Sequence, residues 1–321
     1  MHRNAYDVTG TIPTSEPAAV GQEVVRIYRR LYPRASAALL ERSFADLARL
    51  YDGAHPAYWP CDTEYHDVQH VLDVTLAMAR LMDGYQRSRR PGEETLAREL
   101  FIVGALAALF HDFGYLRKRN DRRHRYGAEY TVVHVSRSAA YLRGYVRELG
   151  LGEALARLAG TLVHFTGYER DAGSIRIAAG GARHLGQMLG TADILAQMAD
   201  RCYLEKCRDR LYPEFVLGAL GARPGARRLP VFASGKDLIA KTPDFYVGAA
   251  RRLERDLAGS HEYAARHFGG PNLYVEYMRR NAAHAGNGRP PLRRQPPRTL
   301  RPGVEPYPSG LVRRGPARLV R

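Results

Sequence analysis

Cysteine is scarce in this chain, which has three cysteines in 321 residues. The number is odd, and Cys61, Cys202 and Cys207 do not have the spacing of a metal-binding finger. Small secreted domains depend on several paired cysteines, so the composition argues against that class. We therefore expect reduced thiols and a cytoplasmic protein.

Long apolar runs are missing as well. The longest has 11 residues, Leu100 to Phe110, whereas a bilayer-spanning helix needs about 20. This run predicts a buried helix and no membrane span. The first residues contain no apolar stretch after a basic start, so we also expect no secretory signal.

Acidic residues are outnumbered, with 33 Asp and Glu against 49 Lys and Arg and a net charge of +16. The excess is uneven, because residues 286–321 hold nine Arg, one Glu and eight Pro. Such a composition cannot form a packed core and predicts a disordered basic tail. We expect at most nonspecific contacts between this tail and nucleic acid, and no specific nucleic-acid binding.

Strand signals are also scarce, since alternation of β-branched and polar residues hardly occurs. Helical periodicity dominates instead, and it predicts an all-α protein. We expect a disordered N-terminus over 1–16, one compact helical domain over 17–285, and the tail over 286–321. The predicted helices cover 18–31, 36–52, 66–83, 93–111, 127–149, 152–165, 183–210, 235–257, 259–268 and 272–284.

Two histidines open the third predicted helix, in the sequence Tyr65-His66-Asp67-Val68-Gln69-His70. His66 and His70 are four residues apart and share one helix face. Both can bind one metal ion, or one can bind the ion while the other acts as an acid or base. A pair of solvated histidines at a helix start is the alternative.

A second candidate, His111-Asp112, follows the apolar run directly. An ionisable pair at that point is at least partly buried, and a buried carboxylate needs a cation or several hydrogen-bond donors. A metal ion supplies that compensation. Asp112 can otherwise serve as a simple helix end before the turn at Gly114.

The third candidate is Asp193, which interrupts an otherwise apolar helical segment, Gly190 to Ala199. Asp200, seven residues later, lies on nearly the same face and competes for the same role. Because Arg201 offers Asp200 an ordinary ion pair, we expect the metal ligand to be Asp193.

Together these residues resemble the His-Asp (HD) superfamily of metal-dependent phosphohydrolases, whose pattern is His, then His-Asp, then Asp. Tyr65-His66 with His70, ahead of the His-Asp pair, is similar to the class I cyclic-nucleotide phosphodiesterase catalytic domain and its bacterial relatives. The resemblance covers roughly residues 60–285. This chain departs from the phosphodiesterases at two points. It has Asp67 where they have Asn, and no residue can be assigned as the glutamine that binds the purine edge in them.

The resemblance implies that His70, His111, Asp112 and Asp193 bind a tight divalent metal ion, usually zinc, with iron or manganese as alternatives. Asp112 would also reach a second ion, magnesium or manganese. It implies that His66 is the general acid. Further positions follow at the second ion or around it: Glu129, Thr166 and His164. His124 and Arg123, in the basic loop after the His-Asp pair, are candidates for contacting the substrate phosphate.

The implied reaction is hydrolysis of a phosphate ester, most simply a phosphodiester such as a cyclic nucleotide, by a metal-bridging hydroxide. His66 would protonate the leaving oxygen, held by an acid such as Glu129 or Asp67. One alternative is a phosphomonoesterase or nucleotide hydrolase of the same superfamily. Another is a non-catalytic, nucleotide-binding regulatory HD domain, in which a proton donor at His66 has no purpose.

Overall fold

The computed structural model describes residues 5–167, 170–221, 232–286 and 304–308. All secondary-structure elements within these ranges are helices, and the only strand-like pairings there are two isolated bridges. The all-α prediction is confirmed. The α-helices are α1 (Pro17–Leu31), α2 (Ala38–Tyr51), α3 (Val68–Ser88), α4 (Arg98–Leu109), α5 (His134–Glu148), α6 (Gly152–Val163), α7 (Gly181–Met198), α8 (Tyr203–Lys206), α9 (Tyr212–Gly221), α10 (Gly235–Ala240), α11 (Thr242–Arg251), α12 (Tyr263–Phe268) and α13 (Leu273–Gly286).

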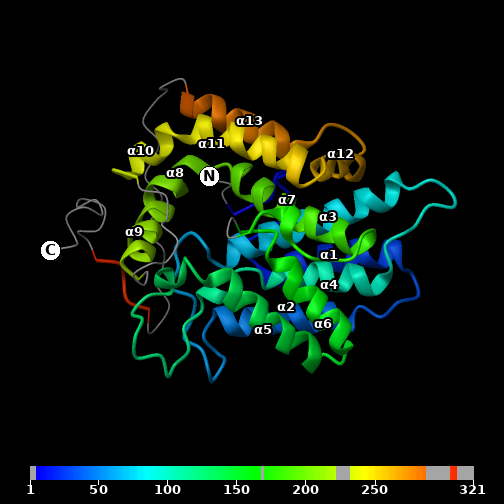
Figure 1. Cartoon of the computed structure of the whole chain (residues 1–321), viewed down its shortest axis with the longest axis horizontal. Coiled ribbons are helices and arrows are strands. Elements are labelled where there is room, and N and C mark those ends of the chain that lie inside the picture. The colour runs from blue at the N-terminus through cyan, green and yellow to red at the C-terminus, as the bar shows by residue number, and fades with distance from the viewer. Residues whose placement is uncertain (1–4, 168–169, 222–231, 287–303, 309–321) are drawn as a thin grey trace.

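Short 3-10 and π segments connect several of these helices. The 3-10 segments are η1 (Phe113–Tyr115), η2 (Gly127–Tyr130), η3 (Ala172–Ser174) and η6 (Ser260–Glu262), and the π segments are η4 (Cys207–Leu211) and η5 (Arg252–Asp256). Figure 1 shows α10 to α13 lying along one side of the body that α1 to α7 form, with α8 and α9 at one end.

Three mutually packed helices, α3, α4 and α7, form the centre of the body. α4 is the apolar run of the sequence, and its residues from Phe101 onward are all buried. α3 begins at Asp67, whose carboxylate caps the helix by accepting the His70 backbone N–H at 3.1 Å. The first turn of α3, the end of α4 and the middle of α7 thus carry His70, His111-Asp112 and Asp193 into one core.

Three long helices of the prediction are broken in the structure. The expected helix 127–149 is divided into the 3-10 segment η2 and the helix α5, which begins at His134. The expected helix 183–210 stops at Met198, because Asn281 of α13 donates hydrogen bonds to the carbonyls of Met198 and Asp200, both at 2.8 Å. The expected helix 235–257 is interrupted at Lys241, where Pro243 starts a new helix. α9 is a helix that the periodicity did not predict.

The N-terminal segment differs from the expected disorder over 1–16, since residues 5–16 pack onto the body. Asp7, in this segment, forms a 2.5 Å ion pair with Arg80 of α3, and both side chains are at most 3% exposed. Arg80 also donates to the Tyr274 hydroxyl at 2.9 Å. Residues 5–16 are ordered because Asp7 binds the buried cation Arg80 on α3. The composition of the first 16 residues alone does not indicate that partner.

We expect Asp7→Asn to lower the free energy of unfolding at neutral pH by about 3 kcal/mol, because it leaves the Arg80 guanidinium buried and unpaired. Burial raises the pKa of Asp7, but Arg80 and the Ile12 backbone outweigh it, so the pKa lies below its ordinary 3.8. The Asp7 contribution is therefore complete above pH 3.8 and is lost as the pH falls below it. Urea unfolding at pH 7 and pH 3 measures this; an equal deficit at both pH values contradicts it.

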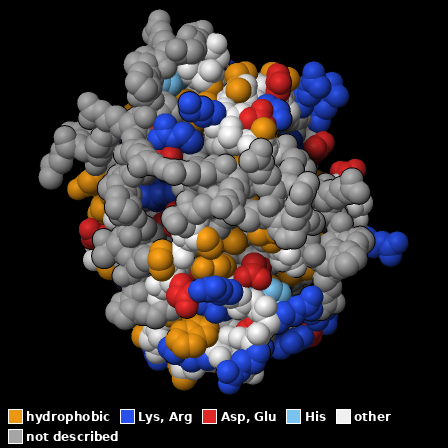
Figure 2. All heavy atoms as spheres, turned by 90° about the vertical axis from the view of Figure 1, so that its left-hand side faces the viewer, with side chains coloured by type: hydrophobic (Ala, Val, Ile, Leu, Met, Phe, Trp, Pro, Cys, Tyr) orange, Lys and Arg blue, Asp and Glu red, His pale blue; other side chains and the backbone are white. Residues whose placement is uncertain are grey.

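The C-terminal stretch predicted to be disordered, 286–321, is described only at Gly286 and at residues 304–308. These five residues lie against the body beside α9 (Figure 1). On the face in Figure 2, the described Lys and Arg side chains stand in separate groups among acidic and apolar ones. No helix in the described ranges is both long enough and apolar enough to cross a membrane.

Candidate metal centre and cleft

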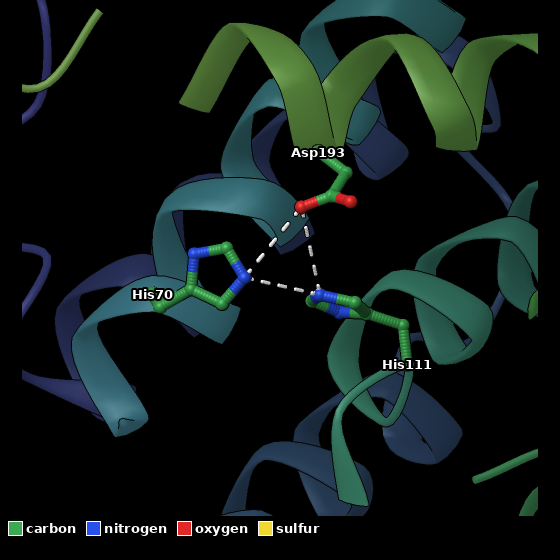
Figure 3. A group of neighbouring side chains, drawn as sticks. All are labelled: His70, His111 and Asp193. Carbon is green, nitrogen blue, oxygen red and sulfur yellow. Dashed lines mark hydrogen bonds and ion pairs between the residues drawn. The ribbon is translucent and has the colours of Figure 1, made fainter. Parts of the chain in front are cut away.

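Four side chains from three helices meet at the centre of the body. His70 Nε2 lies 3.2 Å from His111 Nε2, and Asp193 Oδ1 lies 3.6 and 3.9 Å from these two nitrogens (Figure 3). Asp112 Oδ2 is 3.1 Å from His70 Nε2 and 3.2 Å from His111 Nε2. All four residues are buried. The structure thus brings together the four residues that the sequence singles out as one ligand set.

The protonation of His111 is set by its neighbour. Its Nδ1 lies 2.7 Å from the Ala108 carbonyl, which can only accept, so Nδ1 carries a proton. In the neutral ring the lone pair is then on Nε2, directed at the centre of the cluster. Burial lowers the pKa of His111, but Asp112 and Asp193 outweigh burial and raise it to about 9. The two carboxylates therefore favour the charged form of the ring.

This cluster suits a divalent metal ion by two independent features. Asp112 Oδ2 is buried close to two imidazole nitrogens, yet it has no hydrogen-bond partner among the described residues. A cation needs proximity rather than hydrogen-bond alignment, and it would satisfy this oxygen. The donors are two imidazoles and two carboxylates, a set that zinc, iron and manganese accept. Asp193 is held by Gln197 Nε2, which donates to Oδ1 at 2.6 Å.

The competing acid Asp200 lies outside the cluster. Its carboxylate pairs with the Lys206 ammonium and accepts the Cys202 backbone N–H at 2.7 Å. The partner of Asp200 is thus Lys206 and not Arg201, which the sequence suggested.

His66 lies beside the cluster with its own carboxylate. Its Nδ1 is 2.5 Å from Glu214 Oε2, and its ring centroid is 5.5 Å from that of His70. Burial lowers the pKa of His66, but the charge and hydrogen bond of Glu214 outweigh it and raise it above the ordinary value. With Nδ1 bound to Glu214, Nε2 is the free position for holding a proton.

Glu214 was missed from the sequence, and it corrects two expectations. Asp67, one suggested partner of His66, caps α3 instead. Glu129, the other, caps η2 by accepting the backbone N–H groups of Tyr126 and Arg125 at 2.8 and 2.9 Å. A usable signal existed, because Glu214 is a lone acid among the apolar residues of Tyr212 to Leu217, as Asp193 is in its own helix.

His134, which the sequence does not distinguish from surface histidines, also lies at the site. Its Nδ1 is 2.6 Å from the Thr131 carbonyl and its Nε2 is 3.6 Å from Asp112 Oδ1. The Tyr115 ring is stacked against both His66 and His134, with centroid distances of 4.6 and 4.4 Å, and the two histidine rings are 6.2 Å apart. Gly114 permits this approach, because a Cβ there would lie 2.0 Å from the His134 carbonyl oxygen.

A cleft of about 1360 Å³ opens beside the cluster. Asp112, Asp193 and His66 line its inner end. The outer wall comes from α9, from residues 232–256 and from the loop before η3. It carries apolar and basic side chains, among them Phe215, Phe232, Phe245, Arg170, Arg251 and Arg255, together with the acids Asp171, Asp244 and Asp256. The phenylalanines of this wall offer a surface for an apolar part of a ligand, and its arginines are possible partners for an anionic group.

The remaining candidates divide between the cleft and other places. Thr166 lines the cleft, and its hydroxyl donates to the Val163 carbonyl at 2.8 Å. His164, Glu129, His124 and Arg123 are not among the lining residues. His124 is bound locally, with Nδ1 2.9 Å from Asp121 Oδ2, and Arg123 is exposed. The basic loop is therefore not brought to the inner end of the cleft.

Comparisons with known proteins gave structural likenesses only. No protein-family model matches the chain, and no curated protein matches it. Similar solved structures include the phosphodiesterase domain of rhodopsin phosphodiesterase from Salpingoeca rosetta, with 12% identity, a TM-score of 0.48, and coverage of 88% of this chain and 90% of that one. Another structure of this choanoflagellate domain has 13% identity, a TM-score of 0.45, and coverage of 88% and 93%.

Proposed function

We propose that this protein is a metal-dependent phosphohydrolase whose substrate is a phosphodiester such as a cyclic nucleotide. One observation carries the proposal: Asp112 and Asp193 of the metal-suited cluster line the same cleft as His66, whose ring is bound to Glu214. A cleft with only the cluster would suit binding alone. A histidine held by a buried carboxylate adds a proton donor where the ester would react.

In this proposal His70, His111, Asp112 and Asp193 would hold a divalent ion, and Asp112 would also contribute to binding a second ion. When bound, such ions supply Lewis-acid chemistry and lower the pKa of coordinated water from about 15.7 towards 7. His111 and His70 offer Nε2, while Gln197 keeps the Asp193 carboxylate in place.

The residues around the ester have separate tasks. His66 Nε2 holds the proton that the leaving oxygen takes, and Glu214 keeps the ring oriented and favours its charged form. The arginines of the outer wall, Arg170, Arg251 and Arg255, neutralise charge on the bound substrate. Apolar contact with Phe215 and Phe245 gives the non-reacting part of the substrate a surface to pack on.

The test is a panel of cyclic nucleotides, nucleoside mono- and triphosphates, and bis(p-nitrophenyl) phosphate, assayed after chelation and after adding back Zn²⁺, Mn²⁺ or Mg²⁺. We expect diester hydrolysis that requires added metal. Hydrolysis of only the mono- or triphosphates would assign the protein to the phosphomonoesterase or nucleotide hydrolase alternative. Tight binding of a nucleotide without turnover under every metal would leave a regulatory domain.

A further inference from the structure

His134 and Asp112 meet in the cleft without forming a hydrogen bond. His134 Nε2 lies 3.6 Å from Asp112 Oδ1, which is too long for a hydrogen bond. Both residues line the cleft, and the His134 side chain is 18% exposed. The other carboxylate oxygen, Asp112 Oδ2, lies beside His70 and His111. Asp112 thus offers one oxygen to the four-residue cluster and the other to His134.

The other ring nitrogen of His134 is occupied, which leaves Nε2 available to a metal ion. Nδ1 lies 2.6 Å from the Thr131 carbonyl, which can only accept, so Nδ1 carries a proton. In the neutral ring the lone pair is therefore on Nε2, the atom that faces Asp112. Histidines that bind metal ions usually donate their second ring N–H to a carbonyl or carboxylate in this way. His111 has the same arrangement with the Ala108 carbonyl.

Packing fixes the His134 ring in this orientation. The Tyr115 ring stacks on it at a centroid distance of 4.4 Å and an interplanar angle of 19°. α5 begins at His134, and its first turn is tied to η1 by two hydrogen bonds: the Gly114 backbone N–H donates to Ser138 Oγ at 2.8 Å, and Arg137 Nε donates to the Gly114 carbonyl at 2.7 Å. A ring that is already held in place loses little freedom when it binds an ion.

The distance between His134 Nε2 and Asp112 Oδ1 is close to that between two ligands of one ion. Zinc and magnesium ions lie about 2.0–2.2 Å from nitrogen or oxygen ligands. Two ligands at about 2.1 Å are about 3.0 Å apart at a right angle and about 3.4 Å apart at a tetrahedral angle. The 3.6 Å in the structure is longer than the tetrahedral value by about 0.2 Å, which a small rotation of either side chain removes.

We infer that His134 is a direct ligand of the second ion, which it binds through Nε2 together with Asp112 Oδ1. The inference rests on the proposed function and assigns a residue to the second metal position. Imidazole is a ligand that zinc and iron favour, whereas magnesium prefers oxygen. The assignment therefore favours zinc or iron at this position, where the resemblance implies magnesium or manganese.

The experiment measures metal binding by equilibrium dialysis and elemental analysis, on the full chain after its metal is removed by chelation. We expect wild type to bind two Zn²⁺ ions and His134→Ala one, because the four ligands of the first site remain. The second site of wild type should bind Zn²⁺ about 100-fold more tightly than Mg²⁺, and His134→Ala should reduce this preference about tenfold or more. His164→Ala is the matched control and should still bind two Zn²⁺, since His164 is not among the residues that line the cleft.

NMR of the wild-type protein with ¹⁵N-labelled histidine rings gives a readout that does not depend on the folding of a variant. The second equivalent of Zn²⁺ should shift the Nε2 resonance of His134, and Mg²⁺ should leave it in place. If Zn²⁺ binds through His134 but no phosphate ester is hydrolysed, the proposed function fails and the ligand assignment stands.

Three results would overturn the assignment: a wild-type protein that binds a single Zn²⁺, equal second-site affinity in wild type and His134→Ala, or a His134 resonance that the second equivalent does not move. Any of them would leave His134 as an ion-pair partner of Asp112 only. Hydrolysis of a phosphodiester together with one of these results would retain the proposed function without this ligand.

Discussion

Asp112→Asn should remove the bound metal and lower phosphodiester turnover by about 10³-fold or more, because the carboxylate is the shared element of the cluster. Asp112 Oδ2 lies between the two imidazole nitrogens, at 3.1 and 3.2 Å, and Oδ1 faces His134. An amide keeps the shape of the side chain but removes its charge. Elemental analysis and steady-state kinetics on the same preparation measure both effects.

Asp200→Asn is the matched control for that substitution. Asp200 is a partly buried acid just after the end of α7, and it forms an ion pair with Lys206. The control should lose some stability, since it leaves a buried ammonium unpaired, and it should keep its metal and its turnover per folded molecule. Metal loss in Asp200→Asn with metal retained in Asp193→Asn would exchange the roles of these two acids.

His66→Ala should keep the metal and the fold while lowering turnover of poor leaving groups about 10²–10⁴-fold. The ring lies beside the cluster and is tied to Glu214, so its removal leaves the four proposed ligands in place. Bis(p-nitrophenyl) phosphate should recover most of the loss, because nitrophenolate leaves without a proton.

His70→Ala provides the contrast from the same helix turn. It should lose metal as well as activity, and with the metal it should lose the stability that binding adds. Damage in His66→Ala that does not depend on the leaving group would remove the proton-donor role from His66. Metal loss in both variants would instead make both histidines ligands.

Local sequence signals were enough to predict which residues meet at the centre of the molecule. The apolar run that becomes α4 ends at His111-Asp112, and Asp193 interrupts an apolar helical segment, so these residues carry their own evidence of burial. Buried ionisable groups need a partner. His70 was marked instead by its spacing of four residues from His66. Their meeting in one cluster then follows from the packing of α3, α4 and α7.

Partnerships between distant segments were not accessible in the same way. Glu214 and His66 are 148 residues apart, and α9, which carries Glu214, was not predicted as a helix. Glu129 is a carboxylate and so has the chemistry of a metal ligand. In the structure it accepts hydrogen bonds from two backbone N–H groups of its own segment instead. His134 is brought to Asp112 by the close approach at Gly114, which depends on tertiary packing.

The N- and C-terminal segments show that composition, too, does not predict contacts with distant parts of the chain. Polar, proline-containing stretches predict disorder because they hold too few apolar residues to form a core of their own. Asp7 nevertheless lies buried against the body and Tyr307 partly buried, since the body supplies Arg80 to one and Tyr126 to the other. A segment can become ordered on a surface that already exists.

The most direct test of the metal centre is an anomalous difference map from a crystal grown with Mn²⁺ or Zn²⁺. We expect a peak bound by His70 Nε2, His111 Nε2, Asp112 Oδ2 and Asp193 Oδ1, at about 2.0–2.3 Å from each. The same crystal form of Asp112→Asn should show no such peak. A map without a peak in the wild-type protein, with His70 and His111 joined directly by a hydrogen bond, would contradict the account.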